Sequence, residues 1–229
     1  MAAVGLLYVG AVLFVNGLAL VGFVKGTSMI PMNLFVGLLQ VVTPFYLIFT
    51  AKGDQATIVG ASGLFLFGFT YLYVAMNNAF DYDGTGLGWF CLFVAIAAVI
   101  YCYWNFANYS ALGKADGDVG DLLGVLWGTW AVLWLLFFFV LGLGKTGLTV
   151  FTGAWCAAQG IYTGLIPAVI LLNFPDAITS TLPVIIGIIS IATFVIFFAL
   201  LKPKWGVAEP APPPTATAPT SSGTAYSGA

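Results

Sequence analysis

The sequence predicts an all-α integral membrane protein, a bundle of seven transmembrane helices, and three observations lead to this fold class. The chain of 229 residues is 61% hydrophobic and only 6% charged, whereas soluble domains carry about 25% charged residues. Its mean hydropathy is +1.06. Seven apolar runs, each long enough for the roughly 20 residues that a crossing helix needs, fill most of the chain. Such a chain cannot cover a water-facing surface, so its apolar side chains must face lipid.

The seven runs are separated by the few charges and by clusters of Gly, Pro and Asn. Pro44 and Pro167 lie inside the second and sixth runs, and we expect kinks there because neighbouring groups in a bundle can satisfy the freed carbonyls. The first run lacks the positively charged start of a signal peptide, so we expect it to span and stay. The expected spans are 2–24, 29–50, 57–79, 86–108, 119–142, 146–172 and 178–201.

Lysines in the connections predict the orientation of the bundle. Four lie in the loops on one side and at the end of the last run, namely Lys25, Lys145, Lys202 and Lys204, against Lys52 and Lys114 on the other side. Because cytoplasmic loops are enriched in Lys and Arg, we expect an outer N-terminus and a cytoplasmic C-terminus. After Trp205 the sequence is rich in Pro, Ala, Thr and Ser, which predicts a disordered cytoplasmic tail over 206–229.

Several classes of function are excluded by the residues that the sequence lacks or keeps at its span ends. With no Arg, no His and a net charge of −2, the chain has no basic patch for nucleic acid. Cys91, Cys102 and Cys156 fall inside spans without CxxC spacing and predict apolar filling rather than redox or metal chemistry. No nucleophile–base constellation suggests an enzyme, and we expect no cofactor.

Charged residues are also absent from the span centres, which argues against ion-coupled transport. Proton pumps and voltage sensors keep ionisable residues within the membrane in spite of a cost of about 2.5–3.5 kcal/mol each. A retinal protein would need a Lys in its last span for a Schiff base, and the seventh run has none before Lys202. An ion channel with a filter of backbone carbonyls is less firmly excluded.

Two side-chain amides do lie deep in the expected spans, Asn16 in the first and Gln159 near the centre of the sixth. An amide offers both donors and acceptors, so either residue could contact a neutral solute that carries C=O and NH2 groups. Each could equally be a hydrogen-bonding link between helices, worth about 0.6 kcal/mol on average. The sequence leaves both interpretations open.

Aromatic residues form a second deep pattern. Trp127, Trp130 and Trp134 recur at i, i+3 and i+7 on one face of the fifth span, and Phe67 and Tyr71 are four residues apart on the third. Aromatic belts at the membrane interface lie at span ends, unlike these residues. The pattern fits either packing within the bundle or a narrow slot for a flat solute. Leu6 and Leu13, on the face that carries Asn16, would add apolar rings to such a slot.

Four stretches, taken in order, resemble the AmiS/UreI family of bacterial urea and short-chain amide channels. They are LLYVGAVLFVNG (6–17), LFGFTYLYVAMN (66–77), WGTWAVLW (127–134) and QGIYTGLIPA (159–168). The resemblance implies a homohexamer in the bacterial inner membrane, with one solute path in each protomer. It implies a six-helix channel core over 1–173, to which this chain adds a helix over 174–205. It also assigns Phe67, Tyr71 and the three tryptophans to an aromatic constriction, and Leu6, Leu13 and Asn16 to the pore lining.

The sequence departs from that family pattern at two further places. Gln159 stands where the urea channel has Glu, and the loop at 51–56 is short and has no His, unlike the long outer loop of the acid-gated member. We therefore expect a passive channel for urea and short-chain amides such as acetamide that is not proton-gated. It would feed a cytoplasmic amidase or urease. An alternating-access carrier for the same solutes and a non-conducting assembly subunit are the alternatives.

Overall fold

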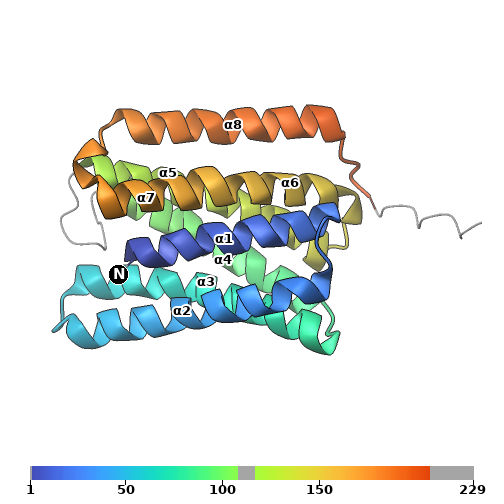
Figure 1. Ribbon diagram of the computed structural model, residues 1–229, viewed down its shortest axis with the longest axis horizontal. Helices are drawn as coiled ribbons and strands as arrows, with labels where there is room; N and C mark the ends of the chain where they lie inside the picture. Colours follow the sequence, from blue (N-terminus) through green and yellow to red (C-terminus); the bar gives the residue numbers. More distant parts are fainter. Residues whose placement is uncertain (1, 108–116, 207–229) are drawn as a thin grey trace, which may run out of the picture.

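The computed structural model describes residues 2–107 and 117–206, and these fold as a bundle of helices that run lengthwise beside one another (Figure 1). Seven helical segments in this part of the chain are long and apolar enough to cross a membrane, which confirms the predicted fold class. The α-helices are α1 (Ala2–Val21), α2 (Ile30–Thr50), α3 (Gln55–Phe80), α4 (Thr85–Phe106), α5 (Gly117–Phe137), α6 (Thr149–Gln159), α7 (Ile166–Asn173) and α8 (Thr181–Leu201). The end of the expected fourth span at 108 and the tail beyond 206 lie outside the described residues.

Short helical segments of other types connect or extend these helices. Two are π-helical: η2 (Phe138–Gly142) lengthens α5, and η4 (Gly160–Leu165) joins α6 to α7, so that one span contains all three segments. The 3-10 segments are η1 (Gly26–Met29), η3 (Thr146–Leu148) and η5 (Pro175–Ala177).

The irregularity in the sixth span has a local cause. Pro167 begins the continuation α7, and a proline ring clashes with the carbonyl four residues before it, here that of Thr163. A π-helical turn widens the helix at such a point, and such turns are frequent where a function depends on the local geometry. Pro44 lies within α2, whose helical range continues to Thr50, and the kink expected there stays a prediction.

The helices of the bundle pack most extensively as α2 with α3, α4 with α5, and α1 with α6 and η4. The contact of α1 with η4 is one of backbone against backbone. A methyl group added at Gly10 would lie 2.6 Å from the carbonyl oxygen of Gly160, and one added at Gly160 would lie 2.5 Å from that of Gly10. Only glycine fits at both positions, which is the small-residue packing that membrane helices use for close approach.

The last helix, α8, lies along the outer edge of the bundle, on the side away from α2 and α3 (Figure 1). It contacts α5 and α6, and only Pro183, Ile186 and Ser190 of its residues are buried. Two hydroxyl groups attach it: Ser190 Oγ accepts from Thr129 Oγ1 at 3.4 Å, and Thr193 Oγ1 accepts from Trp155 Nε1 at 3.2 Å. Most of its length is left to face lipid or another chain.

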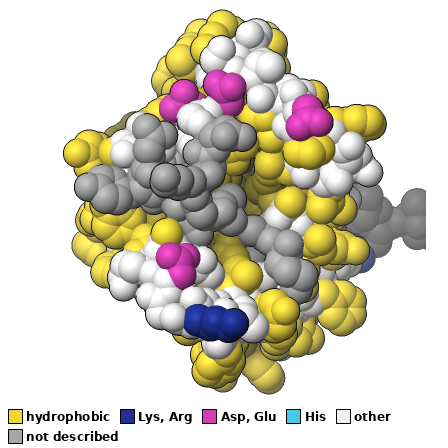
Figure 2. All heavy atoms as spheres, turned by 90° about the vertical axis from the view of Figure 1, so that its left-hand side faces the viewer, with side chains coloured by type: hydrophobic (Ala, Val, Ile, Leu, Met, Phe, Trp, Pro, Cys, Tyr) yellow, Lys and Arg dark blue, Asp and Glu magenta, His cyan; other side chains and the backbone are white. Residues whose placement is uncertain are grey.

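The two ends of the bundle differ in charge. Figure 2 views the end at which α1 begins, where acidic side chains outnumber basic ones among the described residues; they are Asp54, Asp118, Asp121 and Asp176, with Lys52. At the opposite end lie Lys25, Lys145, Lys202 and Lys204, with Asp81 and Asp83. Every charged side chain in the described ranges therefore lies in a loop or near a helix end, as the sequence predicts.

Candidate functional site

Three tryptophans form a stripe on α5 that is buried in the bundle. Trp127, Trp130 and Trp134 are 7%, 4% and 6% exposed. Their spacing of three and four residues puts them on one helix face. Lipid-facing aromatic residues of a membrane belt would be exposed at the helix ends, so this stripe belongs to the interior.

Phe67 of α3 packs against all three tryptophans. Its ring centroid lies 5.5 Å from Trp127, 4.9 Å from Trp130 and 4.8 Å from Trp134, within the range of favourable aromatic pairs. Tyr71, one turn along α3, lies 6.3 Å from Phe67. These five rings, which we call the aromatic cluster, were grouped from the sequence, and the structure brings them together.

Two cavities within the chain meet at the aromatic cluster. Phe67 and Trp130 line both cavities, whereas Trp127 lines one of them and Tyr71 and Trp134 line the other. Phe67 and Trp130 therefore form the partition between the two spaces. Their rings stand nearly perpendicular, at 85°.

The narrow cavity, of about 220 Å³, lies toward the end at which α1 begins. Leu6 and Val9 of α1 give it an apolar wall, and Trp127 gives it an aromatic one. Gln40 and Asn105 supply polar groups, although the Gln40 amide already donates to the carbonyl of Gly5 at 3.0 Å. Its lining includes Ala3 and Thr57, near the starts of α1 and α3.

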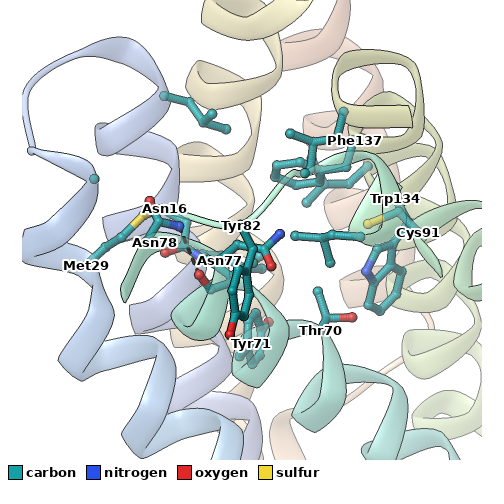
Figure 3. A pocket seen from close by; sticks show the side chains of 18 of the residues that line it. Asn16, Met29, Thr70, Tyr71, Asn77, Asn78, Tyr82, Cys91, Trp134 and Phe137 are labelled. Atoms are coloured by element: carbon teal, nitrogen blue, oxygen red, sulfur yellow. Dashed lines mark hydrogen bonds between the residues drawn. The ribbon is translucent and has the colours of Figure 1, made fainter. Parts of the chain in front are cut away.

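The wide cavity, of about 540 Å³, lies toward the opposite end, where the loops after α1 and α3 contribute Thr27 and Tyr82 (Figure 3). Leu13 and Asn16 of α1 line it together with Tyr71 and Trp134. Its carboxamide side chains, Asn16, Asn77 and Asn78, lie together at the end away from Trp134, as labelled in Figure 3.

Asn16 lines the wide cavity and is also bonded to a second amide. Its Nδ2 donates to Asn33 Oδ1 at 2.9 Å, and Asn33 Nδ2 donates to Asn16 Oδ1 at 2.6 Å. This reciprocal pair joins α1 to α2, so Asn16 serves as a link between helices. The structure thus supports the interpretation as a link and leaves contact with a solute as a prediction.

Gln159 has a different environment from the one expected. It is fully buried on α6, and its amide nitrogen and oxygen have no hydrogen-bond partner among the described residues. It lines neither of the two cavities. Its contact with a solute therefore stays a prediction.

Sequence reasoning did not single out several polar residues of the cavities. Asn77 ends the LFGFTYLYVAMN stretch and Asn78 follows it, and Gln40 and Asn105 lie deep in the second span and near the end of the fourth. Polar residues within spans mark functional paths as a rule, and that signal applies to all four. The positions of these residues relative to the cavities depend on helix packing, which no local pattern gives.

The linings of both cavities carry little charge. Asp81, an exposed residue of the α3–α4 loop, is the single carboxylate among the described lining residues, and no Lys lines either space. Within the described ranges no three potential ligands come together for a metal ion. The geometry offers a neutral path with amide groups at one end and aromatic walls in the middle.

Comparisons with known proteins identify relatives of this chain. Residues 1–174 match the model of the AmiS/UreI family of transporters. A protein of Mycolicibacterium smegmatis, named as a candidate transporter of amidate substrates, is 44% identical over 221 residues, which cover 96% of this chain and 99% of that protein. The acid-activated urea channel of Helicobacter pylori strain J99 is 35% identical over 188 residues, covering 72% of this chain and 94% of the channel. A crystal structure of the urea channel from Helicobacter pylori superposes with a TM-score of 0.65 at 37% identity, over 76% of this chain and 98% of that one.

Proposed function

The chain belongs to the AmiS/UreI family and is a membrane transporter or channel for amides or urea rather than an enzyme, and from this premise we propose that it is a passive pore for urea and short-chain amides such as acetamide. Each chain would hold a complete path. The name of the Mycolicibacterium relative refers to amidate substrates and that of the Helicobacter channel to urea; short-chain amides and urea share a planar unit, a C=O with an attached NH2.

One observation carries this proposal: two cavities inside one chain share a partition made of Phe67 and Trp130. A path that narrows between flat rings suits a planar solute. Leu6 in the narrow cavity and Leu13 in the wide one add apolar walls on either side. A hydrated ion would have to lose its water there without a charged partner to compensate, which is costly.

Selection in this pore would need no chemical step. The aromatic cluster would remove most of the solute's water, and the rings would exclude solutes that are not flat. The amide groups at the mouth of the wide cavity, Asn16, Asn77 and Asn78, would replace part of the lost hydration, since each offers both donor and acceptor atoms. Because urea and amides carry no net charge, their flux would not depend on the membrane potential.

The family resemblance and the charges suggest the setting of this pore. We propose a homohexamer in the bacterial inner membrane, with the end at which α1 begins outside and the lysine-bearing end of α8 inside, in keeping with the enrichment of cytoplasmic loops in Lys. The wide cavity would then open to the cytoplasm. A cytoplasmic amidase or urease would consume the solutes that enter.

A carrier that alternates between two open states is the second candidate. The observation in its favour is the same partition, because Phe67 and Trp130 separate the two cavities. In a carrier the two helices that bear these rings, α3 and α5, would rearrange in each cycle. A pore needs only side-chain motion at the partition.

Replacing Trp130 by Ala tests the proposed path. We expect Trp130→Ala to raise the permeability of a bulkier amide, isobutyramide, relative to acetamide by at least about threefold, since one methylene group in an apolar site changes selection by about tenfold or more. The measurement is stopped-flow uptake of each amide, and of urea, into proteoliposomes that contain the full chain.

Trp155→Ala is the matched control. Trp155 is a buried tryptophan, 2% exposed, that lines neither cavity and donates to Thr193 of α8. Its loss removes the same ring from the interior, so it should cost similar stability and leave the ratio of permeabilities unchanged. If wild type and correctly assembled Trp130→Ala show the same ratio of isobutyramide to acetamide permeability, the tryptophan stripe only packs the interior and does not select solutes.

A further inference from the structure

Trp130, one of the two residues that form the partition, is held in place by a hydrogen bond that its indole N–H donates. Its indole nitrogen Nε1 donates to Thr163 Oγ1 at 3.0 Å, and both side chains are buried. An indole N–H is a donor only, so the direction of this bond is fixed. By contrast, the indole nitrogens of Trp127 and Trp134 donate to no group in the described part of the chain.

Thr163 is itself fixed in place. Its hydroxyl donates to the carbonyl oxygen of Gln159 at 2.6 Å, which uses its one proton and leaves a lone pair for Trp130. Thr163 is fully buried, and its branched side chain has few rotamers. The position of the hydroxyl therefore follows the backbone of the π-helical segment η4.

The same segment also touches the other wall of the path. Gly160 and Gly164, which flank Thr163 in η4, meet Gly10 of α1 at backbone distance, and α1 carries Leu6 and Leu13 into the cavities. Thus η4 is in contact with α1 through its glycines and with Trp130 through Thr163. One short segment fixes the positions of two walls relative to each other.

We propose that Thr163 is a positioning residue that sets the orientation of Trp130 and, through it, the size selectivity of the pore. This inference rests on the proposed function and adds a residue that lines neither cavity. With the N–H directed at Thr163, Trp130 offers a solute its ring and no donor. Without Thr163 the N–H would lose its partner, and the ring would turn to find another within the path.

The test compares three variants of the full chain in proteoliposomes. We expect Thr163→Val, which keeps the shape but loses the hydroxyl, to change the permeability ratio of acetamide to isobutyramide by at least about threefold, because a buried donor without a partner is unfavourable. Thr163→Ser keeps the hydroxyl and should keep the wild-type ratio. Thr163→Ala replaces the valine variant if that one fails to assemble.

Thr152→Val is the matched control, because Thr152 is also fully buried on the sixth span but its Oγ1 has no partner among the described residues. This variant should keep the wild-type ratio. In a Trp130→Phe background, which has no N–H, Thr163→Val should produce no further change. An unchanged ratio in Thr163→Val, an equal change in the Trp130→Phe background, or the same change in Thr152→Val would overturn the proposal.

A spectroscopic readout separates this proposal from the proposed function. The ultraviolet resonance Raman band that reports indole N–H hydrogen bonding, taken as the difference between wild type and Trp130→Phe, should indicate a bonded N–H and should shift in Thr163→Val. If the wild-type chain fails to raise amide uptake above that of empty liposomes, the proposed function fails. The Raman shift still tests whether Thr163 holds Trp130, and its absence would contradict the link.

Discussion

Asp54, at the start of α3, bears on whether protons could control the path. It caps the helix by accepting from the side chain of Thr57 at 2.6 Å and from its backbone N–H at 3.0 Å. The hydrogen bond from the Thr57 side chain, with that from its backbone, lowers the pKa of Asp54 below the usual value of 3.8. At the opposite end of the bundle, Asp83 accepts hydrogen bonds from the backbone N–H and from the hydroxyl of Thr85. These bonds, the backbone one most, lower the pKa of Asp83. Both carboxylates therefore stay ionised to a lower pH than an ordinary Asp side chain does.

We expect the flux of urea and acetamide to stay constant, within about twofold, from pH 7.5 to pH 5. The chain has no His, the side chain that ordinarily titrates near pH 6.5. The lowered pKa values of Asp54 and Asp83 move their titration away from this window, toward more acidic pH. Stopped-flow uptake into proteoliposomes buffered at each pH measures the dependence.

A steep, reversible rise of the flux on acidification would contradict this expectation. It would require a carboxyl group with a strongly raised pKa at the end at which α1 begins, which we propose to be the outer one. Asp118, Asp121 and Asp176 would then be the residues to replace by Asn one at a time, as would Asp116, which lies outside the described residues. The control Asp54→Asn removes a carboxylate but keeps a residue that can cap the helix, and it should keep the flat profile.

A single sequence reveals which site residues share a helix face, but not which residues of other helices they contact. The tryptophan stripe was recognisable because helical spacing at 127, 130 and 134 needs no knowledge of neighbours. The partner of Asn16 was not, since Asn33 lies on another helix and only packing brings the two amides together. For the same reason, the deep placement of Gln159 in its span did not reveal that it lines neither cavity.

At the scale of elements, the contact between α1 and η4 depends on the absence of side chains. A Cβ at Gly160 would lie 2.5 Å from the carbonyl oxygen of Gly10 and 2.8 Å from the backbone nitrogen of Phe14. These are backbone atoms, which cannot move without moving the helix. The two walls that η4 holds would have to separate.

We therefore expect Gly160→Ala to lower the thermal stability of the detergent-solubilised protein and to alter amide permeability, because overpacking of this kind costs about 1–3 kcal/mol. Gly187→Ala is the control. Gly187 lies in α8, where an added Cβ would meet Val125 at an ordinary 3.8 Å, so this variant should match wild type in both measurements. Equal melting temperatures for the two variants would show that the close contact is dispensable.

Helix ends and helix types differ in how far the sequence predicts them. The seven spans follow from apolar length and from the charges between them, and the helices in the structure begin and end within a few residues of the expected positions. The π-helical turn at 160–165 was not expected. Pro167 predicts a disturbance near this point, but whether a helix kinks or widens depends on the contacts with α1.

At the scale of the whole molecule, the two ends differ in charge, and Asp81 is the single charged residue among the described lining residues of the two cavities. Lysines dominate the end at which α8 terminates, and aspartates dominate the end in Figure 2. Between the ends, each cavity is bounded by residues of several helices, with α8 outside them. The described lining residues of both cavities all fall within the part of the chain that the family model matches.

The exposed surface of α8 is large and apolar, and it lies away from the path. Ile188, Ile191 and Leu200 are 62%, 69% and 72% exposed, as befits a helix in contact with lipid or with a second protomer. α8 is held in place by its contacts with α5 and α6. It contains none of the four stretches that resemble the family.

The central claim is that amides cross the chain through a passive pore, and tracer flux into proteoliposomes tests it most directly. Initial rates of labelled acetamide uptake should rise linearly from millimolar to near-molar concentrations. Vesicles preloaded with unlabelled acetamide should show no transient accumulation of label, because a pore does not couple inward to outward movement. Saturation of the rate together with counterflow would contradict the account and would establish a carrier in its place.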